Sequence, residues 1–157
     1  MGGELKMSYS AIAVANAFID IAAENGFYLT NLKLQKLVYF AHGWYSAFTD
    51  KPLITDEVQS WQYGPVIQSL YNALRHYGAR PITKKIHSDQ TITQGLEDWN
   101  FIHSVYRKYA MFSPAQLVAL THEAGSPWEQ FGAGQNSFQI IPVEAIKKYF
   151  KALVNNE

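Results

Sequence analysis

The sequence predicts a mainly α-helical fold, a compact single-domain bundle of about six helices with a small β-hairpin near residues 80–94. Three observations support this fold class. Apolar residues recur every three or four positions in several separate segments, which is the spacing of one helix face. Gly, Pro and Ser residues separate these segments. The chain has 157 residues, 48% of them hydrophobic, so it is long enough to bury one core.

The first two helices are predicted over residues 10–25 and 30–49. The first helix is apolar except for one narrow polar stripe, and Gly26 ends it, so we expect it to be buried on most sides. The apolar face of the second helix consists of Leu34, Leu37, Val38, Ala41, Trp44, Tyr45 and Phe48. The polar residues between them, which we expect to face water, are Lys33, Gln35, Lys36 and Ser46.

The middle of the chain is less regular. Residues 56–63 fit either a short strand or irregular structure. Gly64 and Pro65 then mark a sharp break, and Pro65 suits the first turn of a third helix, which Gly78 closes. Over residues 80–94 the helical spacing is lost and Ile and Thr residues favour extended structure, so we predict a loop or a short hairpin that turns near Ser88.

Three further helices are predicted in the C-terminal half. The fourth covers about residues 96–110 and points its Trp, Ile, Val and Tyr residues inward. Ser113, Pro114 and Gln116 form a helix start with a capping box, and Gly125 ends this fifth helix. Pro142 opens the last helix, whose inward residues are Val143, Ile146, Tyr149, Phe150 and Leu153.

Composition excludes several classes of protein. Lys plus Arg and Asp plus Glu both number 13, so a zero net charge gives no general attraction to nucleic acid or an anionic membrane. The absence of Cys excludes disulfides, thiolate nucleophiles and Cys-based zinc sites. No apolar run approaches the roughly 20 residues of a membrane-spanning helix. We expect a cytoplasmic protein in which residues 1–7 form a disordered leader and residues 8–154 form one domain.

Residues that can carry catalysis are present, but their spacing does not fit a known site. His122-Glu123 begins like a metalloprotease motif, yet Ser126 stands where the second His would be. The acidic pairs Asp56-Glu57 and Glu97-Asp98 lie at expected helix starts, where they complement the helix dipole. We therefore predict no catalytic, cofactor-binding or metal-binding residue, and a protein that is not an enzyme.

Two features point to the binding of another macromolecule. No acidic residue lies between Glu57 and Asp89, an interval with several basic residues, and 15% of the chain is aromatic. Aromatic residues with polar tips at turns often anchor protein interfaces. The partner-binding candidates are Trp61, Tyr63, Arg75, His76, Tyr77, Arg80 and Trp128. The alternatives are that Trp61 and Trp128 close the two ends of the core and that the basic residues form a solvated face.

Four blocks of sequence resemble the Panacea domain, also described as SocA-like or GepA-like. The first is residues 30–44, TNLKLQKLVYFAHGW, and the second is residues 61–66, WQYGPV, followed by Tyr71. The third joins Thr121-His122 to Ser126-Pro127-Trp128, and the fourth covers residues 141–150. Because the blocks keep their order and spacing over nearly the whole chain, the resemblance is specific. It implies a largely α-helical fold.

The resemblance also implies an antitoxin that binds a cognate protein toxin directly, as in toxin–antitoxin systems of bacteria, phages and mobile elements. It implies no catalytic residue. The family motif residues, which we interpret as structural, are Lys33, Gln35, Lys36, Tyr39, Trp44, Gly64, Pro65, Tyr71 and Pro127. Two other functions stay open: an adaptor that delivers a bound partner to a protease, and a nucleic-acid-binding regulator, for which four fixed basic charges are few. Exposed aromatic residues would also permit a homodimer.

Overall fold

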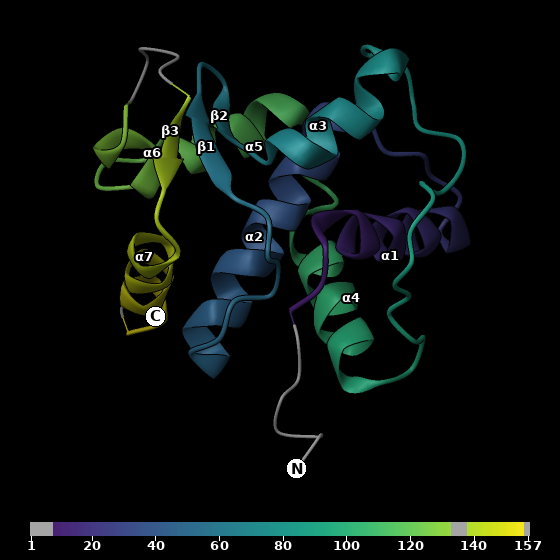
Figure 1. Ribbon diagram of the computed structural model, residues 1–157, viewed down its shortest axis with the longest axis horizontal. Coiled ribbons are helices and arrows are strands. Elements are labelled where there is room, and N and C mark those ends of the chain that lie inside the picture. The colour runs from purple at the N-terminus through teal and green to yellow at the C-terminus, as the bar shows by residue number, and fades with distance from the viewer. Residues whose placement is uncertain (1–7, 133–137, 156–157) are drawn as a thin grey trace.

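The computed structural model describes residues 8–132 and 138–155, and the predicted leader at residues 1–7 lies outside them. The described residues form seven α-helices, a short 3₁₀-helix and a three-stranded antiparallel sheet (Figure 1), so the mainly α-helical class is confirmed with one more short helix than expected. The elements in chain order are α1(Ala11–Glu24), α2(Asn31–Thr49), β1(Val58–Trp61), β2(Gly64–Val66), α3(Gln68–Leu74), η2(Arg75–Tyr77), α4(Glu97–Tyr109), α5(Pro114–Thr121), α6(Pro127–Gln130), β3(Gln139–Ile141) and α7(Val143–Asn155).

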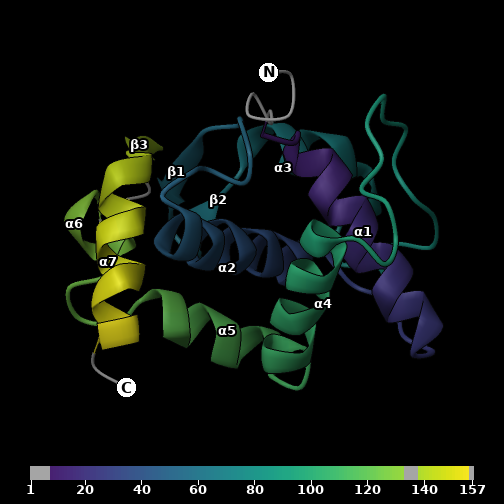
Figure 2. The ribbon, with the colours of Figure 1, turned by 90° about the horizontal axis from the view of Figure 1, so that it is seen from below.

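Helix α2 is the centre of the fold. Figure 2 shows it crossing the middle of the molecule, with α1 and α4 at one end, α7 at the other and α5 alongside. A helix that is covered on all sides must be buried around its whole circumference. Accordingly, every residue from 34 to 46 of α2 is buried.

The prediction that the polar residues of α2 face water is wrong for three of the four. Gln35, Lys36 and Ser46 are at most 2% exposed, because β2, α3 and α5 cover the side of α2 that we expected to be free. Their polar atoms have hydrogen bonds within the protein instead. Gln35 Oε1 accepts from the Ile67 N–H at 2.9 Å, and the Ser46 hydroxyl donates to the Gly43 carbonyl at 2.9 Å.

The β1–β2 hairpin replaces the helix start that we predicted at Gly64 and Pro65. Trp61 pairs with Gly64 and Gln59 with Val66, and α3 begins only at Gln68. Pro65 fits here because β2 is an edge strand, where a missing N–H is tolerated. Strand β3, which the sequence did not indicate, pairs with the other side of β1 from far along the chain.

Residues 80–94 contain no strand, so the predicted loop is confirmed and the alternative of a short hairpin is wrong. This segment forms a strap across α1 that a side chain holds in place. Asn16 donates from Nδ2 to the Ile86 carbonyl at 2.7 Å and accepts from the Ile86 N–H at 2.8 Å. One amide therefore satisfies both backbone polar groups of Ile86, and the side chains of Ile82 and Ile92 in the strap are buried.

The C-terminal helices mostly agree with prediction. The capping box of Ser113 and Gln116 is present, and Pro114 occupies the first turn of α5. This helix ends at Thr121 rather than at Gly125, and the short helix α6 follows. Helix α7 buries Ile146 and Phe150, whereas Val143 is exposed.

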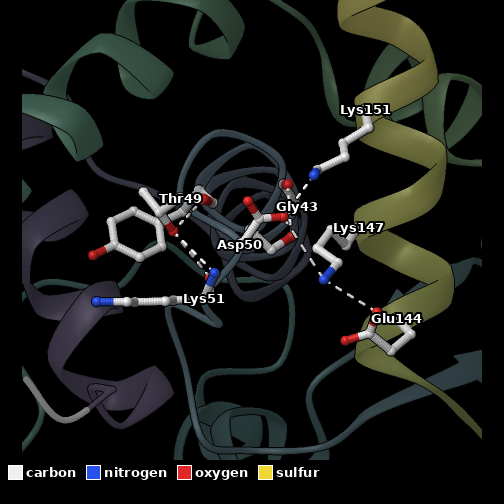
Figure 3. A network of polar contacts seen from close by, with 9 residues as sticks. Gly43, Thr49, Asp50, Lys51, Glu144, Lys147 and Lys151 are labelled. Atoms are coloured by element: carbon white, nitrogen blue, oxygen red, sulfur yellow. Dashed lines mark hydrogen bonds and ion pairs between the residues drawn. The ribbon is translucent and has the colours of Figure 1, made fainter. Parts of the chain in front are cut away.

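Helix α7 packs closely on α2 at a glycine. A Cβ atom at Gly43 would lie 2.2 Å from Cε2 of Phe150, so only Gly permits this approach. Figure 3 shows the same interface at the C-terminal end of α2, where Asp50 Oδ1 lies 2.5 Å from Lys151 Nζ and 3.8 Å from Lys147 Nζ. Among the helices within the described ranges, none has both the length and the apolarity needed to cross a membrane.

Candidate partner-binding site

A cavity of about 610 Å³ opens between the N-terminal turns of α2, the β1–β2 hairpin and the chain that follows η2. This volume is in the range of sites that take small ligands or anchoring side chains. The lining residues are Thr30, Asn31, Leu32, Gln35, Lys36, Trp61, Gln62, Tyr63, Val66, Tyr71, Gly78, Ala79, Pro114 and Phe138. None of these residues is acidic.

Aromatic rings form one wall of the cavity. Trp61 meets Tyr71 edge-on with ring centroids 4.9 Å apart, and it meets Phe138 at 5.1 Å. The Trp61 indole N–H is fixed by a 2.9 Å hydrogen bond to Gln59 Oε1. At the mouth, Tyr63 is 61% exposed and Phe138 is 49% exposed. The wall is therefore held rigidly, while its outer rings remain available for contact.

Basic residues follow the lining segment at α3 and η2. Gly78 and Ala79 line the cavity, and the exposed Arg80 follows directly. The Arg80 guanidinium donates to the carbonyls of His76 at 2.7 Å and Tyr77 at 3.0 Å, which places it against η2. Arg75 is exposed and its carbonyl accepts from the Gly78 N–H at 3.0 Å. Both arginines thus lie within a few residues of the lining.

Two helices begin at the cavity. Thr30 and Asn31 form the start of α2, and Pro114 is the first residue of α5. Each helix N-terminus carries a partial positive charge, and neither first turn contains an acidic residue that would offset it. Together with the adjacent arginines, this makes the cavity electropositive as well as apolar.

Lys36 supports the floor of the cavity and the hairpin above it. Its Nζ atom donates to the Pro65 carbonyl at 3.0 Å, and burial lowers the pKa of Lys36 to about 7. Gly64 lies directly above, since a Cβ atom there would be 2.9 Å from Lys36 Nζ and 2.7 Å from Thr121 Oγ1. Lys36 therefore sets the distance between the β1–β2 hairpin and α2.

His122 and Trp128 close the region behind the hairpin. Their rings stack with centroids 3.5 Å apart and planes 2° from parallel. Burial and the nearby Lys36 both lower the pKa of His122, partly opposed by a hydrogen bond that the imidazole donates to the backbone of Tyr63. The Trp128 indole N–H donates to the Trp61 carbonyl at 2.6 Å, and the side chain is buried. Trp128 thus lies in the packing behind the wall and outside the cavity lining.

Most of the other motif residues lie inside the fold, and Lys33 is partly buried. The Trp44 N–H donates to the Tyr109 hydroxyl at 2.7 Å, and Tyr39 contacts Phe150 edge-on. Lys33 Nζ donates to the Ala110 carbonyl at 2.5 Å, and Pro127 is buried in the first turn of α6. These contacts connect α2 to α4 and α7.

The structure brings Trp61, Tyr63 and the segment around Arg80 to one cavity, although they are separated in the sequence. Sequence reasoning missed Leu32 and Phe138 as lining residues. Leu32 belongs to the first motif block, but its position on α2 gave no sign that the neighbouring hairpin would leave it 38% exposed. Within residues 8–132 and 138–155, no group of three His, Cys, Asp or Glu side chains is arranged to hold a metal ion.

Comparisons with known proteins agree with the resemblance seen in the sequence. The family described as "Antitoxin SocA-like, Panacea domain" matches residues 34–129, which include Lys36, the β1–β2 hairpin and Trp128. The chain is 34% identical over 142 residues to "Antitoxin SocA" of Caulobacter vibrioides (strain NA1000 / CB15N), covering 81% of this chain and 72% of that protein. No solved structure matches the chain. The protein therefore belongs to the antitoxin SocA-like Panacea domain family.

Proposed function

We propose that this protein neutralises a cognate protein toxin in the cytoplasm by binding it directly, through the single domain of residues 8–154. The observation that carries the proposal is the electropositive cavity with exposed aromatic residues at its mouth. Membership of an antitoxin family supports the role, and the relative named Antitoxin SocA supports it further.

Three of the exposed apolar residues line one cavity. Single exposed apolar side chains are ordinary on a protein surface, whereas a group around a concave site is typical of an interface. Leu32, Tyr63 and Phe138 are all more than a third exposed and all line this cavity. A partner that covered them would bury apolar area around a preformed hollow.

The basic stretch gives weaker support to binding of nucleic acid. The stretch between Glu57 and Asp89 carries four Lys and Arg residues in all, and Lys85 Nζ pairs with Asp20 at 3.3 Å. Few cations remain to neutralise phosphates, and non-specific affinity depends on their number. A protein partner fits the same surface better.

Co-expression with the product of the neighbouring reading frame tests the proposal. We expect that product to arrest growth alone, to be tolerated when this protein is co-expressed, and to co-purify with it. If the neighbouring product is toxic and this protein neither binds nor neutralises it, the proposal fails. Measuring the toxin in cells separates simple neutralisation from delivery to a protease, because an adaptor would lower the toxin level.

A homodimer would compete for the same exposed residues. Light scattering of the isolated protein tests this, since a stable dimer through the cavity face would bury Tyr63 and Phe138 and give twice the monomer mass. Neutralisation by direct binding predicts that the toxin displaces any such dimer.

A further inference from the structure

Resting on the proposed function, we propose that the toxin docks by inserting one large apolar side chain into the cavity between α2 and the β1–β2 hairpin, with an adjacent acidic residue meeting Arg75 and Arg80. The partner segment would therefore present an aromatic or large aliphatic residue within a few positions of an Asp or Glu.

The lining residues determine the apolar part of the toxin segment that we propose. Trp61, Tyr71 and Phe138 form a continuous aromatic wall through edge-on contacts, and Val66 extends it along β2. Hydrogen bonds hold the floor, where Gln35 binds both the N–H and the carbonyl of Ile67. A preformed hollow of this kind loses little conformational entropy when a side chain enters it, which is the usual property of an interface hot spot.

The positive charge around the cavity determines the acidic part of the toxin segment. The described lining residues include no Asp or Glu, and two helices begin at the cavity. The chain carries no acidic residue between Glu57 and Asp89. Arg75 and Arg80 are exposed beside Gly78 and Ala79. A segment with a carboxylate next to its apolar anchor complements this field, whereas a basic segment is repelled.

A protein segment fits better than a small ligand or a nucleic acid strand. The exposed apolar surface continues beyond the hollow onto Tyr63 and Phe138, which a ligand confined to the cavity would leave uncovered. Stacking of nucleic acid bases needs open ring faces along a basic groove, and Trp61 is half-buried with two rings set edge-on to it.

Matched variants in a toxin-binding assay test the proposal. We expect Tyr63→Ala, Ala79→Trp, which fills the hollow, and Arg80→Glu each to weaken toxin binding by about tenfold or more. Two control substitutions change exposed residues that lie outside the cavity lining. They are Phe48→Ala, where the ring is 62% exposed, and Lys148→Glu on α7. Circular dichroism and thermal unfolding confirm that each variant folds. If the toxin binds the cavity variants as tightly as the wild type, the inference is overturned while the proposed function stands.

An independent readout needs no toxin. Nuclear magnetic resonance titration with acetyl-Asp-Leu-Asp-amide and acetyl-Lys-Leu-Lys-amide, each to roughly 10 mM, compares the two charges on one apolar anchor. We expect the acidic peptide alone to shift the Trp61 and Ala79 resonances, and Ala79→Trp to abolish the shift. Equal shifts with both peptides, or none with either, overturn the inference. A shift at these residues produced only by a single-stranded oligonucleotide at low salt would also overturn it.

Discussion

The ammonium of Lys36 donates to the Pro65 carbonyl at 3.0 Å from a position with no exposure to solvent, and no carboxylate in the described part of the chain forms an ion pair with it. A buried cation without a counter-ion is unfavourable, so its pKa falls. The hydrogen bond of this residue connects the central helix α2 to the hairpin that forms one wall of the cavity. Lys36 is thus a positioning residue whose charge state depends on pH.

The lowered pKa of Lys36 should make the stability of the protein depend on pH. Burial lowers its folded pKa to about 7 from 10.5, so between these values the unfolded chain holds a proton that the folded protein lacks. The free energy of unfolding should therefore rise from pH 7 towards pH 10, by up to about 1.4 kcal/mol per pH unit. Lys36→Met should remove this rise. Urea unfolding at several pH values measures it, and parallel profiles for the two proteins would contradict the prediction.

Periodicity and cap signals predicted most helices of the fold, because these signals are local. The capping box at Ser113, the buried face of α4 and the bounds of α2 all follow from residues within a few positions of each other. The strap over residues 80–94 could not be predicted in this way. The backbone of Ile86 in this strap is paired with Asn16, 70 positions earlier, which looks in the sequence like one more polar residue on a helix.

The cavity was only partly predictable for the same reason. Turn positions next to Gly and Pro indicated Trp61 and Tyr63, but Phe138 reaches the wall through the pairing of β3 with β1. Lys36 was placed on a water-facing side because an amphipathic pattern assumes that only one face of a helix is covered. In this fold other elements cover α2 on all sides, so the polar residues opposite its apolar face are buried as well.

His42 should make the protein sensitive to acid. It is 2% exposed and its Nδ1 accepts from the N–H groups of Leu53 at 3.3 Å and Ile54 at 3.4 Å. Burial lowers the pKa of His42 to about 4, partly opposed by Asp56, against 6.5 in the unfolded chain. The unfolded state alone is protonated between these values, so stability should fall as pH drops through this window, by about 3 kcal/mol in total.

The His42→Asn variant checks this pH effect, because Asn keeps a side-chain acceptor but does not titrate. Its unfolding free energy should depend less on pH between pH 6.5 and 4 than that of the wild type, the window set by the two pKa values. His87→Asn is the control, since that side chain is 95% exposed. If His87→Asn changes the acid profile as much as His42→Asn does, burial of His42 is not the cause.

Gly64→Ala should destabilise the hairpin more than an ordinary glycine substitution. Gly64 has φ of 115°, and a Cβ atom would lie 2.7 Å from Thr121 Oγ1. Backbone strain and the clash together should lower the free energy of unfolding by about 2 kcal/mol or more. Gly26→Ala isolates the backbone part, because Gly26 has φ of 81° but no atom within 4 Å of its Cβ position. Equal losses in chemical denaturation would mean that the close approach to α5 contributes nothing.

Asn16→Ala should release the strap without unfolding the core. The substitution removes both hydrogen bonds to the backbone of Ile86, leaving a partly buried N–H and carbonyl unpaired at a cost of about 1–3 kcal/mol. Ala itself favours helix α1, so the loss should be confined to the strap. Amide hydrogen exchange should accelerate at Ile86 and stay unchanged in α2, while Asn72→Ala on the exposed face of α3 should alter neither. Faster exchange throughout α2 would show instead that Asn16 supports the whole core.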